Sequence, residues 1–494
     1  MSDAYRALKV RFARISHLRG ALSVLQWDHQ VIMPPGGNGV RAEQMATLRE
    51  IVHGLLTSPE TGELLDRAEQ AGGELDPWQA ANLREMRRSH LHATAVSADL
   101  VTALVRATTA AEMTWREARK LSDFAMLREG LEEVVRLTRE EASAKAEALG
   151  RPPYDALLDG YEPGATTADI DALFEPLADF LPAFLERVLE RQAEPLPLDG
   201  RFPAAGQKLL GERLMSALGF DFERGRLDES LHPFCGGVPD DIRMTTRYDE
   251  EDAFSGLLAI VHETGHALYN AGLPRDWRHQ PVGKPRSFGV HESQSLMVEM
   301  QICRSREFLA FLAPLLTETF GVDGAAFSVG NLYRQAIRVE RGPIRVDADE
   351  VTYPLHIVLR YRLEKALLAG DLTVADLPGA WNEGMRKLLG VEPPDDRRGV
   401  LQDIHWPSGA IGYFPCYTLG AIMAAQLRAA MLEAEPELPF QIATGDFSRL
   451  LTWLRANVHE QGSRYDVQEL LTRATGRPLE LQPFLDHLEA RYLA

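Results

Sequence analysis

Two histidines one helical turn apart, His262 and His266, enclose a glutamate in the segment HETGH. On a helix both imidazoles emerge on one face and can share a metal ion, while Glu263 stands beside them. A zinc ion there lowers the pKa of a bound water from about 15.7 toward about 7, and Glu263 can take the proton as the water attacks a carbonyl group. The spacing predicts a zinc hydrolase with Glu263 as its catalytic base, although HExxH also arises by chance in helical chains rich in glutamate.

A third ligand follows in a second predicted helix, HESQSLMVEMQICRS, which begins at His291 and offers Glu292. Two histidines and one carboxylate leave a fourth position open for water and substrate, and Co²⁺ fits the same ligands as Zn²⁺. Glu299 lies two turns beyond Glu292 on nearly the same face. It either accepts the free ring N–H of a ligating histidine or is a solvated charge. His291 faces another direction and either contacts substrate or supports the loop.

The elements that must position these residues are mostly helical. Acidic residues 249–252 precede the HETGH segment and Gly272 and Pro274 end it, which are start and stop signals for one helix. Apolar residues at three- and four-residue spacing indicate helices from residue 4 to about 194 and again from about 252 to the C-terminus. Only residues 219–248 are rich in glycine, aromatic residues and threonine. They predict a small antiparallel sheet near the site with a turn around residues 236–241.

Composition excludes several classes of protein. Hydrophobic residues make up 45% of the 494 residues and charged residues 25%, the balance of a soluble globular protein. The net charge of −19 repels phosphate backbones and anionic lipid, so nucleic acid and membrane surfaces are disfavoured as partners. The three cysteines are too few for a disulfide framework. With no apolar signal segment at the N-terminus, a cytoplasmic protein is expected.

Six ordered sequence blocks resemble those of the Taq-type metallocarboxypeptidases, a resemblance that extends from end to end of the chain. The blocks are HPF at 232–234, DxRxT at 241–245, HExxH at 262–266, HESQ at 291–294, IRxxAD at 344–349 and GxxQDxHW at 399–406. Similar text stands at 25–37, LQWDHQVIMPPGG, and at 412–420, GYFPCYTLG.

The resemblance implies a fold and an activity. The expected fold is all-α, an elongated subunit with a deep central groove and a small sheet near the active site. The whole chain 1–494 would be one catalytic domain, in which a helical lobe of residues 1–200 forms one cleft wall and residues 201–494 carry the zinc site. The expected enzyme is usually a homodimer, holds one Zn²⁺, and removes C-terminal amino acids from peptides with broad specificity, sparing a C-terminal proline.

A carboxypeptidase must also recognise a free carboxylate. Zinc held by two neutral histidines and one glutamate has about one net positive charge, which is committed to the scissile carbonyl, so a separate cation is needed. Arg345 is the candidate because a guanidinium binds a carboxylate through two parallel hydrogen bonds and the resemblance places substrate recognition in its block. The alternative is that Arg345 pairs with Asp347 or Asp349.

Further polar residues are candidates for the cleft wall. His232 can hydrogen-bond a substrate carbonyl or the tetrahedral intermediate, and Asp241 and Arg243 either contact substrate or brace the hairpin as a mutual ion pair. Tyr413 and Tyr417 either donate a phenolic hydrogen bond to the developing oxyanion or belong to the core. His405 and the adjacent Trp406 are expected to be structural or pocket-lining.

Two other functions compete with this interpretation. Helical zinc oligopeptidases also use HExGH with a downstream glutamate and cut internal bonds of short peptides, but their signature lacks the HPF, IRxxAD and GxxQDxHW blocks. A helical scaffold or chaperone-like module with a vestigial HETGH would bind no metal.

Overall fold

Helices form almost all of the computed structural model, which describes residues 2–230 and 232–493. The first half contains α1 (Asp3–Val31), α2 (Asn38–Thr57), α3 (Pro59–Gln70), α4 (Pro77–Thr94), α5 (Ala98–Leu121), α6 (Phe124–Leu149), α7 (Pro153–Leu158), α8 (Thr167–Arg191) and α9 (Ala204–Ala217). The second half contains α10 (Ala253–Gly272), α11 (Phe288–Leu296), α12 (Arg306–Phe320), α13 (Val329–Ala336), α14 (Tyr353–Ala369), α15 (Leu377–Leu389), α16 (Pro415–Ala434), α17 (Leu438–Ala443), α18 (Ser448–Asn457), α19 (Val467–Thr475) and α20 (Gln482–Tyr492). The predicted mainly helical class is confirmed. None of the described helices combines the length and the apolar character needed to cross a membrane.

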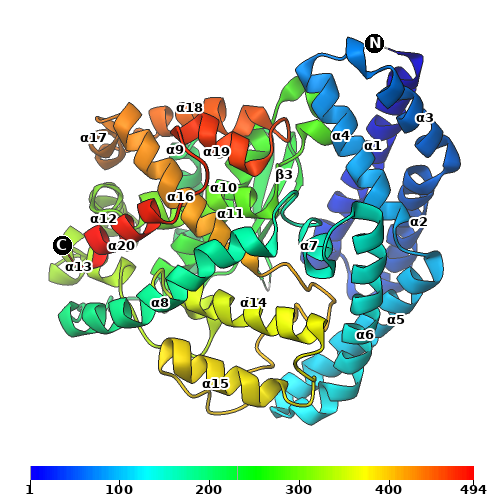
Figure 1. The fold of residues 1–494 in the computed structure, drawn as a ribbon. Helices are drawn as coiled ribbons and strands as arrows, with labels where there is room; N and C mark the ends of the chain where they lie inside the picture. Colours follow the sequence, from blue (N-terminus) through cyan, green and yellow to red (C-terminus); the bar gives the residue numbers. More distant parts are fainter. Residues whose placement is uncertain (1, 231, 494) are drawn as a thin grey trace.

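The buried core has two parts of unequal size. A small cluster of side chains between residues 4 and 86 joins α1 to α4, and a large one between residues 111 and 488 joins α5 to α20. Figure 1 shows α1 to α6 along one side of the molecule and the later helices on the other. The core of the described residues therefore divides near residue 100.

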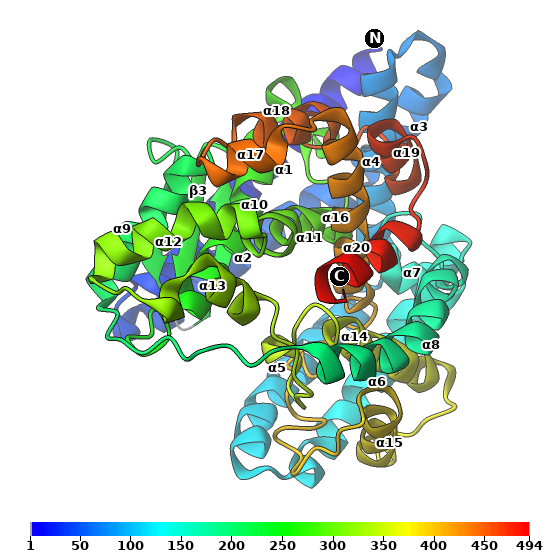
Figure 2. The same cartoon turned by 90° about the vertical axis from the view of Figure 1, so that its left-hand side faces the viewer.

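One helix runs through the interior of the large cluster. The helix α16 packs against α11, α14, α19 and α20, and most of its side chains are buried. Figure 2 shows this arrangement, and it also shows the extended residues 192–203 running from α8 to α9. Since α11 carries a predicted metal ligand, α16 forms part of the scaffold behind the site.

A three-stranded sheet lies beside α10, in the region where a sheet was predicted. Its strands are β1 (Gly225–Glu229), β2 (Phe234–Val238) and β3 (Asp241–Thr246), in the order β1-β3-β2. The β2–β3 pair is an antiparallel hairpin, but β1 and β3 are parallel, so the expectation of a wholly antiparallel sheet is wrong for that pair. The strand β3 inserts between β1 and β2, and a pattern of residue types does not reveal that order. The hairpin requires Gly237, which has φ +86° and leaves no room for a Cβ beside the Asp241 carbonyl oxygen.

Candidate metal centre

Two helices hold the predicted metal ligands. The helix α10 covers the HETGH segment as predicted and is capped by Asp252, whose side chain accepts from the Ser255 N–H. The helix α11 begins at Phe288, three residues before the expected start, because the Ser287 hydroxyl caps it by accepting from the Val290 N–H. The two helices cross very closely at Gly265, where a Cβ would lie 2.4 Å from the Gln294 carbonyl oxygen. Only glycine permits this approach, which brings Glu292 toward the histidines.

The side chains of His262, His266 and Glu292 form a donor set suited to a divalent metal. Their ligand atoms all lie within 4.8 Å of one another. His262 Nδ1 is 3.0 Å from Glu299 Oε2, and His266 Nδ1 is 3.1 Å from the His291 carbonyl oxygen. Each Nδ1–H is therefore used within the protein, which leaves both Nε2 lone pairs free to bind a metal together with the Glu292 carboxylate.

Glu299 fixes the orientation of His262. Although burial opposes ionisation, Arg304 and His262 lower the pKa of Glu299 to about 2, so it is a carboxylate that accepts the His262 N–H. Arg304 donates to Glu299 Oε1 at 2.6 Å. Glu299 lies in a π-helical stretch, η5 (Met297–Cys303), that continues α11. Of the two interpretations of Glu299 drawn from the sequence, the structure shows the hydrogen bond to the histidine.

His291 supports His266 from the side. The two Nδ1 atoms are 2.7 Å apart, and His291 Nε2 is 3.3 Å from Asn270 Oδ1. One tautomer satisfies both contacts: His291 Nε2–H donates to Asn270, and the one His266 Nδ1–H is shared between the His291 carbonyl oxygen and His291 Nδ1. The ring of His291 also lines the cleft beside the metal site.

Glu263 faces the same cleft. Its side chain is 8% exposed, and its carboxylate has no hydrogen-bond partner within the described part of the chain. Burial raises the pKa of Glu263 to about 7, and the carboxylates of Glu292 and Glu299 act in the same direction, while His262 opposes them. A buried carboxylate beside a metal site, unused by the protein, is available for proton transfer.

The cleft has a volume of about 600 Å³, and Arg345 lies in its wall with the predicted metal ligands. Arg345 belongs to the short helix η7 (Arg345–Asp347). It does not pair with Asp347 or Asp349. Its Nε and Nη2 donate to Asp403 Oδ1 at 3.1 and 2.7 Å, and its Nη1 donates to the Tyr353 hydroxyl at 3.0 Å.

Asp403 is shared between two arginines. Arg360, which is fully buried, donates through Nε to Asp403 Oδ2 at 2.7 Å. Burial opposes the ionisation of Asp403, but Arg360 and Arg345 hold its pKa well below the usual range. Burial also lowers the pKa of the neighbouring His405 to about 4, so this imidazole is neutral. Two guanidinium groups against one carboxylate leave one positive charge in excess at the cleft wall.

Sequence reasoning missed Asp403, Arg360 and Tyr353. One signal was available for Asp403, which is the charged residue of the GxxQDxHW block. No comparable signal existed for Arg360 and Tyr353, because the sequence pattern of α14 is that of an ordinary buried helix.

Two of the predicted aromatic residues face the cleft and the predicted histidine lies behind them. Tyr413 and Tyr417 are half-buried and line the cleft with their rings 5.3 Å apart. The His405 Nε2 lies 3.3 Å from the Tyr417 hydroxyl, and His405 is not part of the cleft wall. His405 therefore contacts Tyr417 from behind the cleft wall and can orient its hydroxyl. Trp406 is buried and donates to Glu364 at 2.9 Å.

The remaining candidates from the sheet lie away from the metal site. Asp241 and Arg243 form a bidentate ion pair with both distances 2.9 Å, and Arg243 also stacks over the Trp27 ring. Of the two interpretations of this pair, the structure shows the mutual ion pair. His232 is exposed and lines a neighbouring cavity of about 350 Å³ next to Trp27. Neither the ion pair nor His232 belongs to the wall of the metal cleft.

The chain is similar over nearly its whole length to proteins of one family. Residues 7–492 match the family model described as carboxypeptidase Taq (M32) metallopeptidase. The chain is 40% identical to thermostable carboxypeptidase 1 of Thermus thermophilus, over 99% of this chain and 98% of that protein. Its structure resembles Trypanosoma cruzi metallocarboxypeptidase 1 with a TM-score of 0.98 at 40% identity, covering 99% of both chains. It also resembles the M32 carboxypeptidase of Deinococcus radiodurans R1 with a TM-score of 0.95 at 35% identity, again over 99% of both chains.

Proposed function

The chain belongs to the carboxypeptidase Taq (M32) metallopeptidase family, and from that premise we propose that it removes C-terminal residues from peptides at one zinc ion bound by His262, His266 and Glu292. Membership makes it a metallocarboxypeptidase that requires a divalent metal. The choice of zinc and the number of ions are parts of the proposal, and Co²⁺ suits the same donors.

The observation that carries the proposal is the excess positive charge at Arg345. A guanidinium has five N–H donors, and three of those of Arg345 are used by Asp403 and Tyr353. Two N–H groups remain, on a side chain that is already held in place. A substrate α-carboxylate can accept both, and its charge would balance the second guanidinium of the Arg345–Asp403–Arg360 cluster.

The chain's own groups divide the chemistry between them. A divalent metal, when bound, polarises the scissile carbonyl and lowers the pKa of a water molecule. Glu263 takes the proton from the attacking water and delivers it to the leaving amine. Tyr413 or Tyr417 donates a hydrogen bond to the oxyanion, because both phenols line the cleft. Arg345 fixes the substrate terminus, so that the last peptide bond is the one presented.

The proposal extends to the enzyme's specificity, domain organisation, oligomeric state and location. We expect broad specificity with poor cleavage before a C-terminal proline, whose peptide nitrogen has no N–H to donate. We expect one catalytic domain over residues 1–494, with a lobe of residues 1–200 as one cleft wall, working as a homodimer. A cytoplasmic location is supported by three cysteines that are all free thiols.

Matched peptides test the activity. An N-terminally blocked peptide is prepared with a free acid and with an amide at its C-terminus, and products are followed by mass spectrometry in the presence of Zn²⁺. A carboxypeptidase removes residues one at a time from the free acid and leaves the amide intact. Internal fragments from both peptides would instead establish the oligopeptidase alternative, and the absence of cleavage and of bound metal would establish the scaffold alternative.

A further inference from the structure

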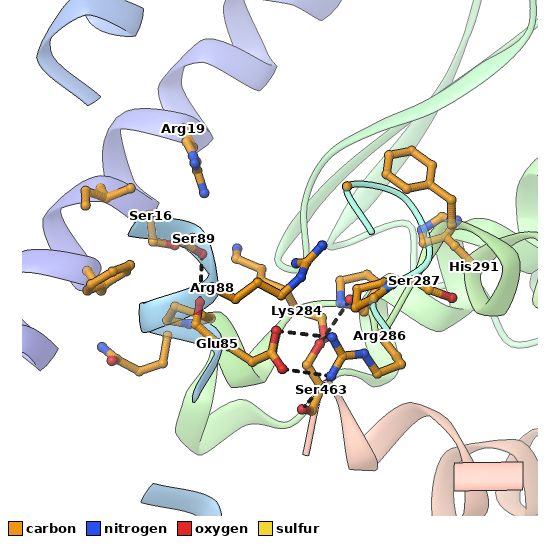
Figure 3. A pocket seen from close by; sticks show the side chains of 18 of the residues that line it. Ser16, Arg19, Glu85, Arg88, Ser89, Lys284, Arg286, Ser287, His291 and Ser463 are labelled. Atoms are coloured by element: carbon orange, nitrogen blue, oxygen red, sulfur yellow. Dashed lines mark hydrogen bonds and ion pairs between the residues drawn. The ribbon is translucent and has the colours of Figure 1, made fainter. Parts of the chain in front are cut away.

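A second cavity adjoins the metal cleft. It has a volume of about 520 Å³ and lies between α1 and α4 on one side and residues 279–291 on the other. Figure 3 shows Arg19 reaching into it from α1, with Arg88, Lys284 and the Glu85–Arg286 pair around the same space. Arg19 and Arg88 also line a further cavity of about 440 Å³, so the basic surface extends beyond a single hollow.

The wall of this cavity carries more positive than negative charge. It contains four cationic side chains, those of Arg19, Arg88, Lys284 and Arg286, against the single carboxylate of Glu85. Arg286 binds Glu85 through two hydrogen bonds of 2.8 and 3.1 Å. Arg88 donates to Asp159, which lies behind the wall, at 2.9 Å.

Arg19 and Lys284 have no acidic partner among residues 2–230 and 232–493. Lys284 is half-buried, and burial and the charge of Arg19 lower its pKa, whereas Arg19 is an exposed residue of the same wall. Two uncompensated cations therefore repel each other across a partly desolvated space. An anion bound between them would relieve both the repulsion and the lost hydration.

This cavity lies next to the proposed catalytic cleft. Phe288 and His291 line both spaces, and the ring of His291 lies 4.5 Å from that of His266. A ligand in the basic cavity can thus belong to the same peptide whose terminal bond lies at the metal site. The chain has a net charge of −19 and as a whole repels an acidic peptide, so a cavity with excess positive charge offers such a peptide local attraction.

We propose that Arg19 and Lys284 form a subsite for the side-chain carboxylate of an aspartate or glutamate near the cleaved bond, so that peptides carrying such a residue are preferred substrates. This inference rests on the proposed carboxypeptidase function. The same chemistry would accept a free small anion, and the experiment separates the two sources.

The test uses four pairs of free-acid peptides, one pair for each of the last four positions, and the two members of a pair differ only in having Glu or Gln at that position. In one of the four pairs the wild-type enzyme should cleave the Glu peptide with a kcat/KM about tenfold higher than the Gln peptide, since a charge-assisted contact is typically worth that factor. The double variant Arg19→Gln/Lys284→Gln should bring that ratio to about one. The double variant Arg106→Gln/Lys387→Gln is the matched control, because it removes the same two charges at exposed positions outside both cavities.

The outcomes distinguish the inference from the function on which it rests. If the wild type cleaves the peptides only as free acids but the ratio of kcat/KM between the Glu and Gln peptides is near one at all four positions, the proposed subsite is overturned and the carboxypeptidase function is not. A ratio that the control lowers as much as the cavity variant shows general electrostatics and also overturns it. If inorganic phosphate changes cleavage of the Gln peptides in the wild type but not in the cavity variant, the site binds a free anion instead. Failure to cleave any free-acid peptide would contradict the proposed function itself.

Discussion

Replacing Arg345 with methionine should abolish the preference for a free C-terminus. Methionine keeps part of the aliphatic bulk but has no N–H groups, so the substrate carboxylate loses the two donors that Asp403 and Tyr353 leave unused. Arg360 continues to hold Asp403, at 2.7 Å, and the pair becomes electrically balanced. The cleft wall then has no excess charge to offer.

The magnitude follows from leaving one carboxylate unpaired. Removing one partner of a hydrogen-bonded, largely buried charge pair costs about 2 to 5 kcal/mol. Because Arg345 is 6% exposed, solvent replaces little of that interaction. The expected decrease in kcat/KM on free-acid peptides is therefore roughly 30-fold to several thousand-fold.

The assay compares free-acid and amidated peptides with wild type, Arg345→Met and a control. Arg338→Met is a suitable control, since Arg338 is half-exposed and pairs with Glu194 and Glu340 outside the cleft. Metal content should be the same in all three proteins, whereas the melting temperature of Arg345→Met should fall because Asp403 and Tyr353 each lose hydrogen bonds from Arg345. If Arg345→Met cleaves free-acid peptides at the wild-type rate, another cation recognises the terminus. Arg304, which also lines the cleft, would be replaced next.

Four further predictions concern the metal site and its support. Glu263→Gln should retain the metal and lose turnover by several orders of magnitude, because the ligands are untouched and the base is gone. Metal analysis and steady-state kinetics measure these two effects, and activity near that of wild type would contradict the assignment of Glu263 as the base. Glu292→Ala should lose metal and activity together, and normal metal content after dialysis would place the third ligand elsewhere. Glu299→Gln should weaken metal binding about 10- to 100-fold in chelator competition, whereas Glu318→Gln on the exposed face of α12 should not. Gly265→Ala should lower both the melting temperature and the metal affinity, because the Cβ of the alanine would lie 2.6 Å from the Ser295 Cα and force α10 and α11 apart. An unchanged melting temperature would refute the importance of that contact.

The local part of the candidate site could be predicted from the sequence. A helix repeats every 3.6 residues, so HETGH and the segment after His291 determine which side chains share a face of each helix. For that reason the sequence placed His262 beside His266, and Glu299 on the face of Glu292. The hydrogen bond from His262 to Glu299 agrees with that geometry even though α11 continues as a π-helix.

Tertiary structure alone decided which elements face one another. The sequence offered Asp347 or Asp349 as the alternative partner of Arg345, yet Arg345 pairs with Asp403 and shares it with Arg360, because residues far apart in the chain meet behind the cleft. The parallel pairing of β1 with β3 is another arrangement that residue types do not encode.

The cavity lined by Arg19 and Lys284 also depends on tertiary structure alone. Arg19 and Lys284 come from segments more than half the chain apart, and nothing in the text around either one marks it as functional. Spacing within one helix is fixed by backbone geometry, so a sequence displays it directly. The meeting of two distant segments depends on how all the buried side chains pack at once, and only the folded molecule shows that result.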